Sequence, residues 1–146
     1  MTLADYVDLQ NFTAQEVMDT GGNPETMERG QMVGMQNLRS MIGRRIVLLH
    51  GGMNSGEHTA AEHPEGRASD FILDPKDGPI NQAVIYKVFT SAIACGFKGI
   101  GVYFNGVCWS FHVDSGQDVA FWIGRKSTPN AEGWTYRRMQ IGSPAA

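Results

Sequence analysis

The sequence predicts an α+β domain in which helices pack on a mainly antiparallel sheet, and three observations favour this class. Two strand-like segments, 100–104 and 107–114, flank Asn105-Gly106, a dipeptide typical of a β-hairpin turn. A broad apolar face recurs at helical spacing over residues 80–95. The chain also lacks the repeated strand–helix alternation that a parallel sheet would require.

Length and composition predict one soluble domain that comprises residues 1–146. The hydrophobic content is 42% and the formal net charge is −3. Since Lys and Arg are not in surplus, we expect no nucleic-acid partner. No apolar run approaches roughly 18 residues, and no charged start precedes an apolar stretch, so we expect neither a membrane span nor a signal peptide.

The first third of the chain predicts two helices. Thr13 and Glu16 have the spacing of a capping box, in which each residue binds the backbone amide of the other, so a short helix should begin there. Pro24 fits the first position of a second helix, which should run to about Ile42 and end at Gly43. Its apolar positions follow the helical period only loosely, so packing must stabilise it.

A buried strand, a long loop and a second strand should follow. Residues 45–50 form an almost continuous apolar run, which predicts a central strand buried on both faces. Residues 51–66 lack periodicity, and loops of about that length are usually functional or disordered. A strand over 69–73 and a turn should then lead into the helix over 80–95, which Gly96 would cap.

The hairpin should use a type I′ turn at Asn105-Gly106. On its second strand, alternation places His112 and Asp114 on the less apolar face. Further strands are expected over 119–123 and within 134–141, before a frayed tail at 142–146. The two cysteines are expected to be buried thiols, Cys95 at a helix end and Cys108 in a strand.

Three residues have the chemistry of a metal site. His63 lies in a Pro- and Gly-rich loop, Asp70 opens an apolar strand, and His112 lies on the polar face of the hairpin. A buried aspartate is costly unless a charge or a metal ion partners it. Two imidazoles and one carboxylate suit zinc, whose catalytic sites use three protein ligands and keep one position for water.

Two short patterns indicate a family. His63, Gly66, Ala68 and Asp70 satisfy H-x-x-G-x-A-x-D, and a glycine-rich strand, a turn and a strand ending in His-x-Asp follow. In this order the patterns resemble the zinc peptidases that include D-alanyl-D-alanine carboxypeptidases and L-alanyl-D-glutamate endopeptidases, especially small phage-associated and bacterial forms. The similarity runs from about residue 12 to about residue 124.

The resemblance implies a hedgehog-like fold and a zinc peptidase whose ligands are His63, Asp70 and His112. The implied substrate is a peptidoglycan stem peptide, and the implied setting is a phage or prophage cell-wall hydrolase, either an endolysin or an enzyme that opens the wall at infection. Its location would then be the host cytoplasm before lysis, or the virion, where other virion or tail proteins would be partners.

Metal hydrolysis also needs a group that transfers the proton of water. Many relatives use a Glu or Asp three residues before the last histidine ligand, where this chain has Trp109. Asp114 is the first candidate because it shares a strand face with His112, although it could equally orient that histidine. Glu62 and Glu65 flank the first ligand and are further candidates.

The sequence leaves several roles open. Relatives carry an arginine after the buried strand that this chain lacks, and Arg67 or His50 could supply the polar contact; a strand-end role is favoured for His50. His58 is expected to be a solvated loop residue. The chain could also be a non-catalytic virion or wall-binding protein of this fold, or a metal-free interaction domain in which His63 and His112 never meet.

Overall fold

The structure, a computed structural model, describes residues 1–56, 61–116 and 118–139. Within these residues, six strands form one mixed sheet in the order β1-β2-β4-β3-β5-β6. The helices are η1 (Leu3–Asp8), α1 (Ala14–Asp19), η2 (Pro24–Thr26), α2 (Arg29–Ile42), η3 (Pro75–Asp77) and α3 (Gln82–Ala94). The strands are β1 (Ile46–Leu48), β2 (Ala68–Leu73), β3 (Gly99–Phe104), β4 (Trp109–Asp114), β5 (Ala120–Arg125) and β6 (Thr135–Met139).

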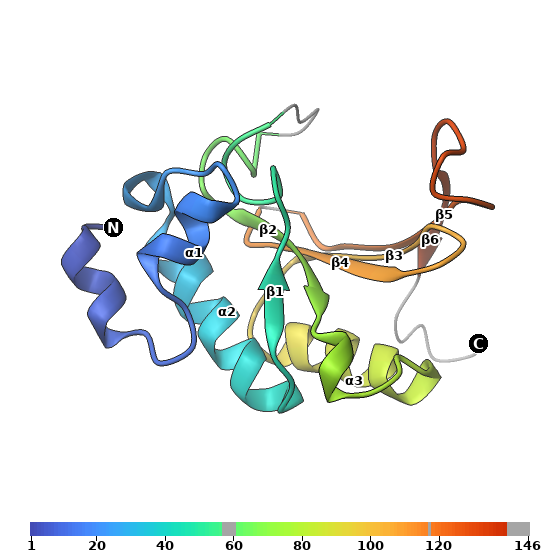
Figure 1. The fold of residues 1–146 in the computed structure, drawn as a ribbon, viewed down its shortest axis with the longest axis horizontal. Helices are drawn as coiled ribbons and strands as arrows, with labels where there is room; N and C mark the ends of the chain where they lie inside the picture. Colours follow the sequence, from blue (N-terminus) through green and yellow to red (C-terminus); the bar gives the residue numbers. More distant parts are fainter. Residues whose placement is uncertain (57–60, 117, 140–146) are drawn as a thin grey trace.

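The α+β class is confirmed, and the sheet is mixed. Its neighbouring strands pair antiparallel except for β3 and β5, which run parallel. The exception arises because the chain leaves β4 and enters the sheet again on the far side of β3, where the Ala120 amide donates to the Lys98 carbonyl. Helix α3 lies against one side of the sheet, and the loop after β1 rises on the other (Figure 1).

The hydrophobic core fills the space between the sheet and helices α2 and α3. Alternate residues of β2, β3 and β4 point into this space and are almost fully buried, as strand geometry requires. The other sheet face carries His112 and Asp70. The principal core residues are Met32, Met35, Leu38, Phe71, Val88, Phe89, Ala92, Ile100, Val102, Phe111 and Val113.

The predicted capping box is present at the start of α1. The Thr13 hydroxyl accepts a hydrogen bond from the Glu16 amide, and the Glu16 carboxylate accepts one from the Thr13 amide at 2.7 Å. The chain before it forms η1, which the sequence did not predict. The Tyr6 hydroxyl donates to the Pro24 carbonyl at 2.7 Å and attaches η1 to η2.

The prediction of one helix from Pro24 to Ile42 is wrong. The chain forms a single 3-10 turn, becomes extended at Met27 and Glu28, and begins α2 only at Arg29. The extended backbone brings Met27, 1% exposed, into the core. The Glu28 amide then donates to the Gly66 carbonyl at 3.0 Å, which ties the start of α2 to the loop that carries His63.

The first strand is also shorter and more peripheral than predicted. β1 covers only Ile46–Leu48 and lies at the sheet edge, not at its centre. Val47 is 41% exposed, in keeping with the position of β1 at the sheet edge. The next residue, Leu49, donates its amide to the Asp70 carbonyl, and Gly52 bonds back to Leu49, so the strand gives way to a turn.

The hairpin of β3 and β4 is confirmed, but its type I′ turn is not. Phe104 pairs with Trp109, which leaves a four-residue connection. A type I′ turn needs positive φ at both central residues, and no described non-glycine residue has positive φ. Instead the Asn105 side-chain oxygen accepts from the amides of Val107 and Cys108. Cys108 therefore lies exposed in the connection and is not a buried strand thiol.

The remaining elements follow the sequence closely. The Asn81 side chain accepts from the Val84 amide at 2.9 Å and caps α3. β5 and β6 fall near the predicted positions, whereas residues 140–146, which include the end of the last predicted strand and the tail, lie outside the described residues. Every helix in the described part of the chain is too short or too polar to traverse a lipid bilayer.

Candidate metal centre

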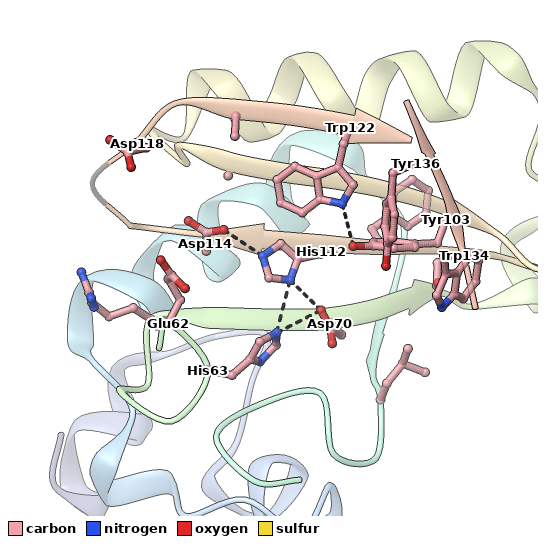
Figure 2. A pocket seen from close by; sticks show the side chains of 16 residues that line it. Glu62, His63, Asp70, Tyr103, His112, Asp114, Asp118, Trp122, Trp134 and Tyr136 are labelled. Carbon is pink, nitrogen blue, oxygen red and sulfur yellow. Dashed lines mark hydrogen bonds and ion pairs between the residues drawn. The ribbon is translucent and has the colours of Figure 1, made fainter. Parts of the chain in front are cut away.

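Three side chains converge on the open face of the sheet. The Nε2 atom of His63, one carboxylate oxygen of Asp70 and the Nδ1 atom of His112 all lie within 4.8 Å of one another. His112 Nδ1 is 2.8 Å from Asp70 Oδ1 and 3.3 Å from His63 Nε2, and His63 Nε2 is 3.4 Å from Asp70 Oδ1 (Figure 2). These side chains are the ones that the sequence patterns single out.

Strand pairing brings two of the three residues together. Asp70 on β2 is the cross-strand partner of His112 on β4. Paired residues of neighbouring strands project from the same face, so the carboxylate and the imidazole lie side by side. The Asp70 amide donates to the Gly52 carbonyl at 2.7 Å, and this bond holds the loop after β1 against strand β2.

His63 reaches the pair from the loop between β1 and β2. Its Nδ1 atom lies 2.7 Å from the Met53 carbonyl oxygen, and its side chain is 6% exposed. A carbonyl can only accept, so Nδ1 carries the proton and Nε2 faces the cluster. Such a backbone partner on the second nitrogen is typical of metal-binding histidines, because it fixes the tautomer and the ring orientation.

The glycine of the first motif explains how the loop is held. Gly66 has φ +74°, and a side chain there would overlap the backbone at Thr26 and Met27. Its carbonyl accepts from Glu28, while the next amide, of Arg67, donates to the Glu62 carbonyl at 2.7 Å. Glycine is therefore needed for both conformation and close approach.

Asp114 binds the side of His112 that faces away from the cluster. Its Oδ2 atom is 2.8 Å from His112 Nε2, and its Oδ1 accepts from the Gly116 amide at 2.9 Å. The carboxylate lies directly over Gly99, where any side chain would overlap it. A carboxylate on the second nitrogen of a ligand histidine orients the ring.

The three charged groups influence one another's pKa values. Burial alone would raise the pKa of Asp70, but hydrogen bonds and charge from His112 and His63 outweigh it and lower that pKa to about 2. Burial would lower the pKa of His112, yet Asp114 and Asp70 raise it to about 9. For Asp114, burial is likewise outweighed by His112 and the Gly116 amide, and its pKa is lowered.

The arrangement could hold a metal ion. A tetrahedral site with ligand distances near 2.0–2.2 Å separates neighbouring ligand atoms by roughly 3.3–3.6 Å. The His63–His112 and His63–Asp70 separations of 3.3 and 3.4 Å fall in this range. The Asp70–His112 separation of 2.8 Å is a hydrogen-bond length and would have to open slightly.

The cluster lies in a cleft of about 830 Å³. Among the described residues that line it are Glu62, Arg67 and Asp114, but neither Glu65 nor His50. Arg67 forms an ion pair with Glu65 at the rim. His58 lies outside the described residues.

Two expectations from the sequence can be compared with this geometry. In the metal-free alternative, His63 and His112 were expected never to meet; that part is wrong, because their nitrogens are only 3.3 Å apart. Trp109 does not line the cleft; it packs beside the core, with its ring centroid 4.7 Å from that of Phe104. The side chain of Trp109, three residues before His112, thus points away from the cluster.

Sequence reasoning missed an aromatic surface in the same cleft, made of Tyr103, Trp122, Trp134 and Tyr136. We call these four residues the aromatic wall. The signal for this wall is that glycines pair with most of these residues across the sheet and leave room for their rings. The pairing depends on the order of the strands in the sheet, so it could not be read from the sequence alone.

Comparisons with protein-family models, with curated proteins and with solved structures gave no match for this chain. Function must therefore be inferred from the geometry of the cleft and from the two residue patterns. The class that the geometry supports is a domain in which three side chains on one sheet face could hold a metal ion.

Proposed function

We propose that the chain is a zinc-dependent metallopeptidase of the hedgehog-like peptidase type that hydrolyses peptide bonds in peptidoglycan stem peptides. One observation carries the proposal. His63, Asp70 and His112 belong to two separate sequence patterns, and His63 and His112 are 49 residues apart. Their ligand atoms nevertheless lie together in one cleft. Metal-ligand chemistry explains both the residue types and their convergence.

The donor set suits zinc more than a hard cation. Two imidazole nitrogens and one carboxylate oxygen are ligands that zinc binds well, whereas calcium and magnesium prefer oxygen. Zinc at such a site would polarise the scissile carbonyl and make water a nucleophile near neutral pH. His63 and His112 would bind through Nε2 and Nδ1, and each would keep its present partner on the other nitrogen.

Two carboxylates could move the proton. Asp114 lies beside His112, and the sequence placed it first for proton transfer; its bond to His112 Nε2 favours the positioning role instead. Glu62 precedes the first ligand, and its carboxylate reaches the same part of the cleft, near Gly116 (Figure 2). Glu62 is therefore the next residue to test as the proton-transfer group.

We further propose a phage or prophage setting, in which the enzyme is an endolysin or acts from the virion on the cell wall. The support is the likeness of the two motifs to small phage-associated zinc peptidases. The partners would then be peptidoglycan itself and, in a virion, other tail proteins.

Metal analysis of purified variants tests the site. The parent should contain one zinc per chain, and His63→Ala, Asp70→Ala and His112→Ala should each lose most of it. His50→Ala is the matched control, because His50 is exposed and does not line the cleft. The sequence suggested His58→Ala as a second control. Equal zinc content in all of these proteins would rule out the assignment.

Release of peptides from purified peptidoglycan, with and without a chelator, tests the reaction. A chelator-sensitive release that zinc restores would support a hydrolase. The second candidate function, a non-catalytic zinc-binding wall or tail protein, is favoured by one observation: both oxygens of Asp114 are already engaged, by His112 and by Gly116. Zinc binding without any peptide release would select this second function.

A further inference from the structure

The aromatic wall begins beside the metal centre and extends to the sheet edge. The ring centroid of Trp122 is 5.3 Å from that of His112. Trp122 Nε1 donates to the Tyr103 hydroxyl at 2.6 Å, and the ring of Tyr103 is 5.1 Å from Trp134 and 6.3 Å from Tyr136. Figure 2 shows this wall on one side of His112 and the carboxylates of Glu62 and Asp118 on the other.

Two glycines of the sheet leave space for the rings of Trp122 and Tyr103. A side chain at Gly101 would come within 2.6 Å of the Trp122 indole, and one at Gly124 within 2.6 Å of the Tyr103 ring. Both glycines therefore leave the space in which the rings cross the strands. Packing within the core does not account for the wall, since it lies on the sheet face opposite α2 and α3 and Tyr136 is 59% exposed.

Charge indicates what the wall could bind. Lys126 Nζ already lies 4.6 Å from the centroid of the Trp134 ring. This ammonium would repel a cationic group of a ligand at the same place, so a ligand without a cationic group is favoured. The rings meet edge to face, at 76° for Tyr103 and Trp134, and form an open surface that does not enclose a side chain.

We propose that the aromatic wall binds a sugar ring of the glycan strand to which the stem peptide is attached. An N-acetylated hexosamine is neutral, has an apolar C–H face that can stack on an aromatic ring, and has hydroxyls that can bond to Tyr and Trp polar groups. This inference rests on the proposed function, because continuity with a peptidoglycan-cleaving site is what selects a sugar as occupant.

Binding of the peptide-free disaccharide N-acetylglucosaminyl-N-acetylmuramic acid amide, in which the lactyl carboxylate is converted to a neutral amide, tests the wall without any need for turnover. Titration calorimetry on the zinc-loaded full chain should show saturable binding. Trp134→Ala and Tyr136→Ala should each weaken that binding about tenfold. Tyr86→Ala is the matched control, since Tyr86 is 69% exposed on α3, away from the cleft, and should leave the affinity unchanged. Circular dichroism and zinc content verify each fold, and Tyr136→Ala suffices if Trp134→Ala does not fold.

A second arm compares hydrolysis of a disaccharide-linked peptide with that of the same peptide without sugar. The parent should prefer the linked substrate about tenfold in kcat/KM, mainly through KM, and Tyr136→Ala should abolish this preference. Absence of disaccharide binding to the parent, or an equal loss in Tyr86→Ala, would overturn the inference. Disaccharide binding without hydrolysis would uphold it and reject the proposed peptidase activity, whereas hydrolysis without sugar preference would do the reverse.

Discussion

Each imidazole of the candidate metal centre directs one ring nitrogen toward the cluster and the other toward a fixed partner. For His63 the partner is the Met53 carbonyl, and for His112 it is the Asp114 carboxylate. Because each ring is held by a hydrogen bond on its other nitrogen, the nitrogens that face the cluster stay directed at Asp70. The second partners should therefore matter for metal affinity almost as much as the ligands.

Replacing Asp114 by Asn tests this at the residue scale. The variant keeps the shape but weakens the bond that orients His112, so zinc affinity should fall about 10–100-fold, with turnover per bound zinc largely kept. Competition with a fluorescent chelator measures the affinity. If Asp114 instead transfers the proton, zinc affinity should stay near that of the parent while kcat falls by about 10²–10⁴-fold, and Glu62→Gln should then have little effect.

A variant of Gly99 tests whether the Asp114 carboxylate needs the space that this glycine leaves free on β3. Gly99→Ala would place a methyl group where the Asp114 carboxylate lies, so zinc affinity should fall by at least as much as in Asp114→Asn. Gly30→Ala is the matched control: nothing lies within 4 Å of the added methyl group, and in helix α2 alanine should be neutral or stabilising by up to about 1 kcal/mol. Equal zinc binding in both variants would contradict the argument.

At the scale of elements, the loop between β1 and β2 is held by contacts distant in sequence. Gly66 bonds to Glu28 at the start of α2, and Gly51 donates to the Thr20 carbonyl at the end of α1. These bonds connect the N-terminal helices to the loop that presents His63. The helices before residue 43 thus help to position the site, although none of their residues lines the cleft among those described.

Tyr6 provides a test of how these N-terminal elements are attached. Burial raises the pKa of its phenol to about 12 from the usual 10. Its contribution to stability should be complete below about pH 10 and be lost as pH rises from 10 to 12, because the unfolded phenol ionises first. Tyr6→Phe should cost about 1 kcal/mol at neutral pH, through loss of the bond to Pro24.

Urea unfolding across pH 8–12 measures both effects. Between pH 10 and 12 the free energy of unfolding should fall more steeply in the parent than in Tyr6→Phe. Tyr86→Phe, at an exposed position on α3, serves as control and should follow the parent. Parallel curves for the parent and Tyr6→Phe would show that the buried phenol does not govern alkaline stability.

At the scale of the whole molecule, the candidate metal centre joins the loop after β1, strand β2 and strand β4. These segments become neighbours only in the folded sheet, so a metal ion bound by all three would favour the native state over the unfolded chain. At a free zinc concentration of about 100 times Kd, the stabilisation should be about 2.7 kcal/mol.

Thermal unfolding followed by circular dichroism checks this expectation. Zinc should raise the Tm of the parent by several degrees, and the shift should disappear in His112→Ala. His50→Ala should keep the full shift, because His50 lies outside the cleft. A zinc-induced shift of equal size in His112→Ala would indicate binding elsewhere on the chain.

The sequence alone determined the local features of this protein. Side chains within a few residues of one another determine the capping box at Thr13, the helix capped by Asn81 and the hairpin strand that carries His112. The three ligand candidates were also identifiable, because an aspartate in an apolar strand needs a charged partner and because the motifs that contain His63, Asp70 and His112 resemble those of known zinc peptidases.

Tertiary structure decided what depends on distant partners. β1 became an edge strand because strand order, and not hydrophobicity, determines which strand lies centrally, and the second helix was divided because Met27 packs in the core and Glu28 bonds to Gly66. The sequence put Asp114 on the face of His112, but only the fold shows which imidazole nitrogen it binds. Such contacts join residues far apart in the chain, so local pattern cannot specify them.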